Sequence, residues 1–191
     1  GSFTAYSGHP AFRIIRLLPD GDRDPAFDSG TGAEDGGINK LLVDVDGRII
    51  IVGSFWNYNG ASRRAIARLN ADGDLDTSFD PGTGASYKIY SAAFQPDGKI
   101  VIVGYFSSYD GVPRECVARI NADGSLDPTF DPGVGPSNYV EDCAVQADGK
   151  IIIAGRFDSY AGVNIKGLAR LNADGTLDTG FLIGPGLGGL G

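Results

Sequence analysis

Acidic residues at alternate positions are the part of this sequence that could bind a metal ion. Residues 20–24 (Asp-Gly-Asp-Arg-Asp) and 72–76 (Asp-Gly-Asp-Leu-Asp) each place three carboxylates two positions apart. Calcium takes about six to eight oxygen ligands, and neither run has the Gly and Glu spacing of the helical calcium loop. Later copies replace the middle acid with Ser125 and Thr176. We therefore interpret the runs as turns and expect no cofactor, with calcium as the alternative.

Tyrosines recur two residues before a glycine, at Tyr6, Tyr58, Tyr109 and Tyr160. Aromatic faces can stack on sugars or clamp a peptide, but a tyrosine can equally pack inside and bond backbone with its hydroxyl. The residues beside them vary between copies, and loops on a rigid scaffold usually carry function. The candidate ligand-binding residues are therefore Trp56, Asn57, Tyr58, Ser107, Ser108, Tyr109, Asp158, Ser159 and Tyr160.

An arginine and an aspartate eight residues later recur in every copy. A guanidinium held in a sheet needs an acceptor, and the aspartate on the following segment is the nearest candidate. We interpret the pairs as structural ion pairs, with a ring of ligand-binding arginines as the alternative. The expected pairs are Arg16 with Asp24, Arg68 with Asp76, Arg119 with Asp127, and Arg170 with Asp178.

Histidine and cysteine give no support for a zinc site or a nucleophile. His9 is the only histidine and lies beside Pro10 in an expected loop, without a second ligand nearby. Cys116 and Cys143 fall where other copies carry residues such as Ala65 and Ala92. We interpret both cysteines as small core residues, with a disulfide as the alternative.

A repeat of about 51 residues explains why the same residue types return. The segment Ala-Arg-Leu/Ile-Asn-Ala-Asp-Gly occupies residues 67–73, 118–124 and 169–175. A weaker copy of this half of the unit lies 52 residues before the first, and the half therefore occurs four times. The other half, Asp-Gly-Arg/Lys-Ile at residues 46–49, 97–100 and 148–151, occurs three times. The printed chain therefore begins inside a repeat.

Each unit predicts four short strands separated by turn residues. In the first complete unit these are residues 41–45, 49–52, 65–70 and 75–79, the second being a continuous apolar run. Asp-Gly pairs follow the first and third strands and predict type I′ hairpin turns. Four antiparallel strands per unit of this length favour an all-β, β-propeller or partial propeller fold over a β-solenoid.

The repeated residues resemble a known family. The pattern Gln-x-Asp-Gly-Lys-Ile, Gly-x-Phe, Ala-Arg-Leu-Asn-x-Asp-Gly-x-Leu-Asp and Phe-x-Pro-Gly is similar to the delta-60 repeat, which occurs mainly in bacterial secreted and cell-surface proteins. The resemblance covers nearly the whole chain. It implies a propeller and an extracellular or cell-surface location, and it brings no established activity and no catalytic residues.

We expect one repeat array over residues 1–191. It divides into a half blade (3–37), three blades (38–88, 89–139 and 140–183) and a glycine-rich tail (184–191). The formal net charge of −8 disfavours nucleic acid and anionic membranes as partners. No apolar run is long enough to span a bilayer, so no membrane insertion is expected.

The leading functional interpretation is a noncatalytic interaction or display module that binds a glycan or a protein through its blade-end loops. A purely structural spacer or oligomerisation module is the alternative. An enzyme is disfavoured because the acids that break the repeat have no partnering base. These acids are Glu34, Asp35, Glu141 and Asp142.

The half blade predicts an open edge. Residues 12–17 resemble a third strand without the second strand on which it should pair. Unpaired amides at such an edge invite another strand. We therefore expect either a longer propeller or a homodimer that pairs equivalent edges about a two-fold axis.

Overall fold

Each repeat unit builds one antiparallel sheet in the computed structural model, which describes residues 1–181. The tail predicted at 184–191 lies outside the described residues. The unit's first two strands pair as a hairpin, and its third strand pairs with the other edge of the second. The three sheets, called the first, second and third blade, are β4 (Ile38–Val43), β5 (Ile49–Gly53) and β8 (Ile66–Leu69); β9 (Lys88–Phe94), β10 (Ile100–Tyr105) and β13 (Val117–Ile120); and β14 (Val140–Val145), β15 (Ile151–Gly155) and β18 (Leu168–Leu171).

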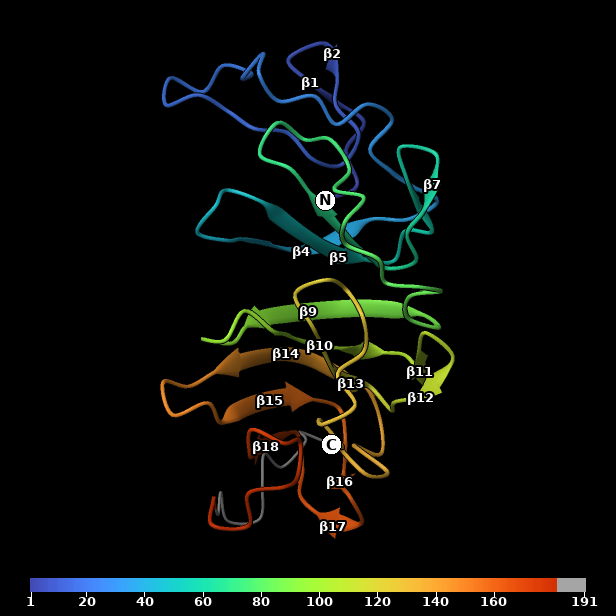
Figure 1. Ribbon diagram of the computed structural model, residues 1–191, viewed down its shortest axis with the longest axis vertical. Helices are drawn as coiled ribbons and strands as arrows, with labels where there is room; N and C mark the ends of the chain where they lie inside the picture. Colours follow the sequence, from blue (N-terminus) through green and yellow to red (C-terminus); the bar gives the residue numbers. More distant parts are fainter. Residues whose placement is uncertain (182–191) are drawn as a thin grey trace, which may run out of the picture.

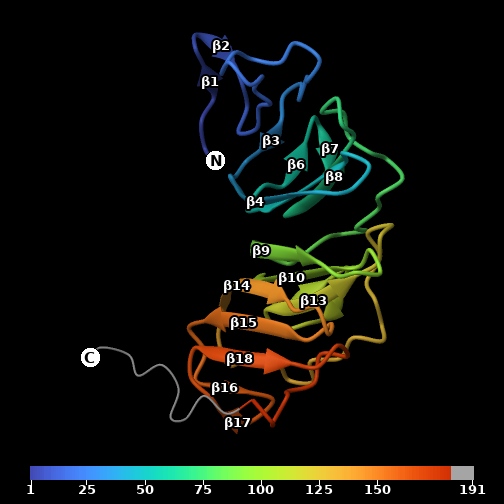
Figure 2. The same ribbon diagram turned by 90° about the vertical axis from the view of Figure 1, so that its left-hand side faces the viewer.

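The three blades follow one another along the longest axis of the molecule, and in the third blade β14, β15 and β18 succeed one another toward its end (Figures 1 and 2). The first strands of successive units, β4, β9 and β14, contact one another, as the innermost strands of neighbouring propeller blades do. Residues 1–37 lie at one end of this stack and β18 at the other. The described residues therefore form an arc of blades, which confirms the all-β propeller architecture expected from the repeat.

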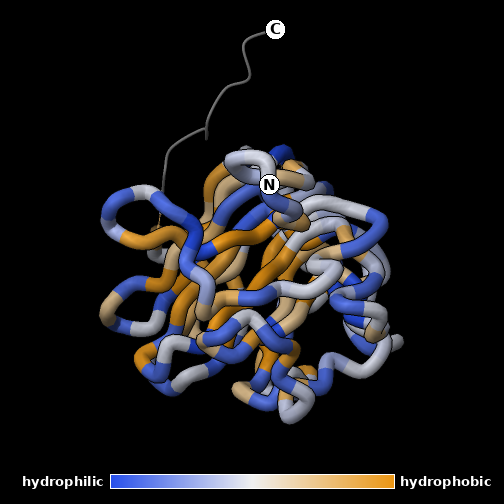
Figure 3. The backbone as a smooth tube through the Cα atoms, turned by 90° about the horizontal axis from the view of Figure 1, so that it is seen from above, coloured by the Kyte–Doolittle hydropathy of each residue, from blue (hydrophilic) through white to orange (hydrophobic). Residues whose placement is uncertain are grey.

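Apolar residues of the middle strands fill the space between blades. In β5, Ile50 and Val52 face the second blade, whereas Ile51 packs toward the first repeat copy. This alternation explains why the middle strand reads as a continuous apolar run, since both of its faces are buried. In Figure 3 the hydrophobic colour accordingly gathers on the strands and the hydrophilic colour on the outer turns. Burying one such side chain stabilises the fold by about 1.5–3 kcal/mol.

A short hairpin occupies the segment between the second and third strands, where the sequence predicted a loop. Its turn in the first blade is Asn59-Gly60, with φ values of 49° and 75°, so both central residues adopt the left-handed conformation of a type I′ turn. The hairpins are β1 (Ala5–Tyr6) with β2 (His9–Pro10), β6 (Asn57–Tyr58) with β7 (Ala61–Ser62), β11 (Ser108–Tyr109) with β12 (Val112–Pro113), and β16 (Ser159–Tyr160) with β17 (Val163–Asn164); β3 (Ala33–Glu34) also pairs with β6.

The Asp-Gly pairs do not form the predicted type I′ turns. At the turn after β4, Gly47 has a φ of 79°, but Asp46 is not among the residues of positive φ. The Gly47 amide donates to the Asp44 carbonyl at 3.1 Å, and the Asp44 amide donates to Arg48. The side chain of Asp44 also accepts from the amide of Asp46 at 2.9 Å. This local capping by a short acid favours a turn with one left-handed glycine over the type I′ alternative.

The prediction of a fourth strand is also wrong, because no strand forms over residues 75–79. The only ladder contact of this segment is an isolated bridge between Leu69 and Leu75. The Asp76 amide donates to the Arg68 carbonyl as part of this bridge, and beyond it the chain turns, with the Ser78 amide bonded to Asp76 Oδ1 and the Phe79 amide to the Asp76 carbonyl. This turn brings the Asp76 carboxylate back to the Arg68 guanidinium. An ion pair therefore takes the place of continued strand pairing.

Residues 12–17 form no named strand either, and Leu17 makes only an isolated bridge to Arg23. Instead, the Arg13 amide bonds the Phe3 carbonyl, and Ile14 is buried in the core beneath the first blade. The predicted edge strand is therefore replaced by an irregular segment, and dimerisation through it stays a prediction.

The first blade differs from the other two beside its joint with the second blade. Within their own units, Lys99 and Lys150 bond Asp127 and Asp178, whereas Arg48 turns away to Asp44 and Asp46. A cavity of about 410 Å³ lies here, lined by side chains that include Val43, Ile50, Arg68, Phe94 and Ile100. The first joint is therefore hollow at the end of the blades that carries the Asp-Gly turns.

Ala161 provides a test of the hairpin turns. It has a φ of 48°, where a residue with a Cβ is strained and asparagine is tolerated. The matching residue Asp110 also accepts the Thr83 amide at 2.9 Å, a bond that alanine cannot make. Ala161→Asn is expected to raise the free energy of unfolding by about 1 kcal/mol, measured by urea denaturation. Ala161→Val should lower it, and equal stability of the two variants would contradict the turn assignment.

Candidate binding surface

Every recurring arginine pairs with its aspartate, as the sequence predicted. Arg68 Nε lies 2.7 Å from Asp76 Oδ2, and Arg119 Nε lies 2.7 Å from Asp127 Oδ2. The same guanidiniums donate across the joint to the carbonyl oxygens of Ala122 and Ala173, both at 2.5 Å. The remaining pairs, Arg16 with Asp24 and Arg170 with Asp178, are also formed. The arginines therefore hold blades together, and this use of their donors disfavours the alternative of an arginine ring for a ligand.

Asp127 is the most completely bonded of the four aspartates. Burial alone would raise its pKa, but hydrogen bonds from Lys99, Thr129 and Arg119 outweigh burial and hold the pKa well below its usual range. At Asp178, hydrogen bonds led by Lys150 lower the pKa to about 2. Both carboxylates are therefore charged at neutral pH and stabilise the fold through their partners.

Asp127→Asn should lower the free energy of unfolding by about 3 kcal/mol, because it leaves the buried Arg119 and the partly buried Lys99 without this charged partner. Asp24→Asn is the matched control: its partner Arg16 is 39% exposed, so solvent screens the pair and the loss of stability should be much smaller. Urea denaturation of both variants provides the comparison. Equal losses would show that burial of the pair does not matter.

The same carboxylates predict acid sensitivity. Their pKa values are lower in the folded protein than in the unfolded chain, so the folded state binds fewer protons. Their stabilisation is fully present above about pH 4 and is lost as pH falls toward 2. The acid-induced loss of stability should be shallower in Asp127→Asn than in the unsubstituted protein.

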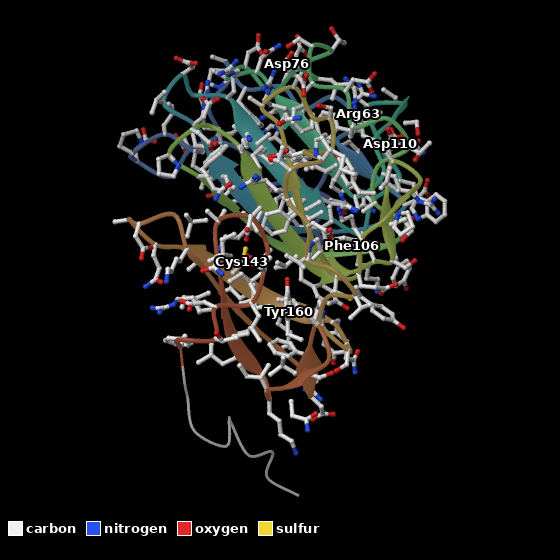
Figure 4. The ribbon with its side chains drawn as sticks, turned by 60° about the horizontal axis from the view of Figure 1, so that its bottom comes forward. Arg63, Asp76, Phe106, Asp110, Cys143 and Tyr160 are labelled. Carbon is white, nitrogen blue, oxygen red and sulfur yellow. The ribbon has the colours of Figure 1, made fainter. Side chains whose placement is uncertain are left out.

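The recurring tyrosines lie inside the fold, so the packing interpretation is the one that the structure supports. Tyr58, Tyr109 and Tyr160 are fully buried, and their hydroxyls donate to the carbonyls of Gly73, Gly124 and Gly175 at 2.7–2.9 Å. Tyr160 is seen among the strands in Figure 4, whereas Asp110 lies at the periphery. Burial raises the pKa of each buried tyrosine. The prediction that these three tyrosines contact a ligand is therefore wrong.

Tyr109→Phe should lower the free energy of unfolding by about 1–2 kcal/mol, since it leaves the buried Gly124 carbonyl without its donor. Tyr6→Phe is the control, because Tyr6 makes the same bond to Gly21 at 2.8 Å from a partly exposed position. Thermal denaturation should show the larger effect at Tyr109. A larger effect at Tyr6 would contradict the packing role.

The remaining predicted residues do lie at one end of the blades. Trp56, Ser107 and Asp158 are exposed, and Asn57, Ser108 and Ser159 are half-buried. In the second blade, Ser86 Oγ accepts the amides of Ser107 and Ser108. In the third, Ser137 Oγ accepts the amides of Asp158 and Ser159. These loops are therefore fixed by their own hydrogen bonds while some of their side chains face outward.

A row of aromatic side chains that the sequence analysis missed runs beside these loops. Tyr87 and Tyr105 have ring centroids 5.8 Å apart, Tyr105 and Tyr139 are 5.9 Å apart, and Tyr139 and Tyr90 are 5.9 Å apart. All three contacts are edge-to-face, a favourable arrangement of aromatic pairs. Tyr87 and Tyr105 are about half exposed, at 48% and 51%. With Trp56, these four tyrosines are called the aromatic row.

The tyrosines of the row lie at the end of β10 and at the beginnings of β9 and β14. These strand ends are on the right in Figure 1, near β11 and β12. A groove of about 590 Å³ includes Trp56, Arg64 and Thr83 in its lining. A second groove, of about 420 Å³, is lined by Tyr87, Tyr105 and other residues. A small hollow lined by Trp56, Arg64 and Tyr87 lies between them. The grooves therefore follow the row across neighbouring blades.

Departure from the repeat was the signal that could have found this surface. Tyr105 stands where the other copies have Ser54 and Arg156, and Tyr90 stands where they have Asn39 and Glu141. A residue needed only to pack a blade should recur in each blade. Aromatic residues that appear in one copy and gather on one exposed face are instead candidates for recognition.

Three of the four acids that break the repeat are engaged in structural contacts, and the fourth, Asp35, lines the groove at Trp56. Glu34 accepts from Thr31 and the Gly60 amide. Asp142 accepts from Ser91 at 2.6 Å, and Glu141 lies 3.4 Å from Arg156. Residues 1–181 contain no group of three or more His, Cys, Asp or Glu side chains arranged to hold a metal ion.

Both cysteines are free thiols in the core between the second and third blades. Their predicted role as small core residues is therefore confirmed. Burial raises the pKa of Cys116 to about 11 and that of Cys143 to about 12. Neither is a thiolate at neutral pH, which a nucleophile would have to be.

Comparison with family models places these units in a family. The chain belongs to the family described as a domain of unknown function (DUF5122) β-propeller, whose model matches well over half of the residues. This confirms the propeller-like repeat family, while the narrower delta-60 assignment stays a prediction. The matched segments are residues 1–27, 46–79, 95–130 and 146–181.

Two solved structures are similar at low identity. A candidate gluconolactonase is 18% identical with a TM-score of 0.45; the match covers 84% of this chain and 52% of that one, so the chain spans about half of its length. A protein of unknown function from Bacteroides caccae is 12% identical with a TM-score of 0.35, covering 86% of this chain and 72% of that one. No curated protein matches the sequence. Within the part of the chain that the structure describes, no helix could cross a membrane.

Proposed function

We propose that this propeller is a noncatalytic interaction module of a bacterial secreted or cell-surface protein, and that it binds its partner along the aromatic row. The observation that carries the proposal is the edge-to-face series of tyrosines that only part of the array contains, in which Tyr87 and Tyr105 are half exposed. Tyrosine and tryptophan offer large contact areas and have few side-chain torsions to immobilise. The location rests on the resemblance of the repeat to secreted proteins.

The aromatic row favours recognition over a purely structural spacer. A spacer needs only the elements that recur in each unit, such as the arginine–aspartate pairs and the buried tyrosines. The half-exposed rings of Tyr87 and Tyr105 are absent from the corresponding positions of the first and third blades. Exposed aromatic groups that are not needed to hold the array together are typical of binding surfaces.

The contacts of the acids near the aromatic row favour binding over catalysis. Catalysis by acid and base needs a pair of groups poised to transfer a proton to a bound substrate. Glu141 lies beside Arg156, and Asp142 is bonded by Ser91, so both acids already serve local contacts. The exposed Glu115 lines the groove with Tyr105 and serves as a polar contact in the proposal.

The intrinsic fluorescence of Trp56, the only tryptophan, provides a direct assay. Ligands from a combined glycan and peptide library should change its emission on binding. Tyr105→Ala should weaken the binding of any such ligand at least about tenfold, since it removes the central ring of the row. Val45→Ala is the control, because Val45 is fully exposed on the turn between β4 and β5.

Retained affinity in Tyr105→Ala would count against this surface, as would equal losses in the two variants. Thermal denaturation of each variant separates lost binding from lost folding. Tyr109→Phe is a second control, since it weakens the packing of the blade and should leave the affinity unchanged.

A further inference from the structure

We propose that the partner of the aromatic row is an uncharged polysaccharide chain, which lies across the row from the Trp56 groove toward Tyr139. This inference rests on the proposed function and names the class of its ligand. The shape, polar groups and charge of the surface support a polysaccharide, and the state of the backbone around it disfavours a peptide.

Shape is the first argument. The grooves at Trp56 and at Tyr105 follow one another across two blades and lie open to solvent, which suits an extended chain more than a compact small molecule. Neighbouring rings of the row pack edge to face, so they differ in orientation along it. A sugar ring has an apolar C–H face that can stack on an aromatic face while its hydroxyls point outward. The rings of Tyr87 and Tyr105 are half exposed and available to such a contact, and Lys88 lies over the Tyr87 ring.

Hydrogen-bonding groups line the same grooves. Asn57, Ser62 and Thr83 line the first groove, and Ser107 and Glu115 line the second. Hydroxyl and amide groups can both donate and accept, and a carboxylate accepts. Sugar hydroxyls also both donate and accept, so a glycan can satisfy this mixed set. Apolar surface flanked by such groups matches the two-sided character of a pyranose.

Charge along the surface favours an uncharged chain. The cations Arg64 and Lys88 lie over the rings of Trp56 and Tyr87, at 4.1 and 5.1 Å. The acids Asp35 and Glu115 line the same grooves and balance them, while Glu141 is paired with a third cation, Arg156. The whole protein carries a formal net charge of −8, which repels an acidic polymer. This distribution of charge does not favour an acidic polysaccharide.

The backbone around the row offers little to a peptide. Peptides that extend a sheet bind through an edge with unpaired amides, but the amides beside the row already have acceptors. Those of Ser107 and Ser108 donate to Ser86 Oγ, that of Trp56 donates to the Glu34 carbonyl, and that of Arg114 donates to the Ser107 carbonyl. These four amides are therefore not free to extend a sheet with a peptide.

Affinity electrophoresis and titration calorimetry of the whole chain test the proposal. The probes are hydroxyethylcellulose, xyloglucan, glucomannan, laminarin and dextran as uncharged chains, alginate and polygalacturonate as acidic chains, and a proline-rich peptide library. At least one uncharged polysaccharide should bind and none of the acidic chains should bind more tightly. Raising the salt concentration should change this affinity less than twofold, since no charge pair forms.

Variants locate the ligand on the row. Trp56→Ala and Tyr105→Ala should each weaken polysaccharide binding at least tenfold, whereas Tyr105→Phe should retain affinity within about threefold because it keeps the ring. Val45→Ala should bind like the unsubstituted protein. Circular dichroism and thermal denaturation confirm that each variant is folded before its affinity is compared.

The outcomes separate this inference from the proposed function. Peptide binding that Tyr105→Ala abolishes, without binding of any uncharged polysaccharide, overturns the glycan assignment and leaves the interaction surface in place. Tighter binding of alginate or polygalacturonate also overturns it. Binding that is insensitive to both alanine variants, or no binding to any probe, overturns both proposals.

Discussion

The array depends on the guanidinium of the third-strand arginine. In the first two blades this one group bonds the aspartate of its own unit, lies over a phenylalanine ring and donates to a carbonyl in the turn of the next unit. A planar group with five fixed donors can satisfy several such partners at once, which an ammonium cannot do with the same geometry. The Asp80 amide strengthens the same joint by donating to the Asp123 carbonyl at 2.7 Å. Folding within a blade and stacking between blades therefore rest on shared atoms.

Recurrent residues serve the scaffold, and residues that depart from the repeat make its surface distinctive. Tyr109 recurs and is buried with its hydroxyl bonded, whereas Tyr105 occurs in one unit and is half exposed. The two tyrosines lie four residues apart in the chain, yet only the first is needed by every blade. A fixed scaffold allows such exposed positions to vary at little cost, because surface substitutions usually change stability by less than about 0.5 kcal/mol.

Periodicity explains what the sequence could predict. The pairing of Arg68 with Asp76 and the burial of Ile49–Val52 follow from residue types that return every unit, so sequence reasoning found them. The fourth strand failed because apolar spacing at Leu75 and Phe79 resembles a strand, while the Asp76 ion pair turns the backbone. The aromatic row was missed because it joins residues from separate segments, such as Tyr105 and Tyr139, that meet only when two blades stack. A local sequence pattern does not predict this contact between side chains.

The hollow joint beside Arg48 has a consequence for how the array comes apart. In a stack where each unit touches only its neighbours, cooperativity is limited by the weakest interface. Arg48 pairs within its own turn, whereas the corresponding Lys99 bonds Asp127 of its own unit, and side chains that include Ile50 and Phe94 line the cavity at the joint. Because a cavity reduces the contact between two blades, we expect this joint to open before the rest of the array.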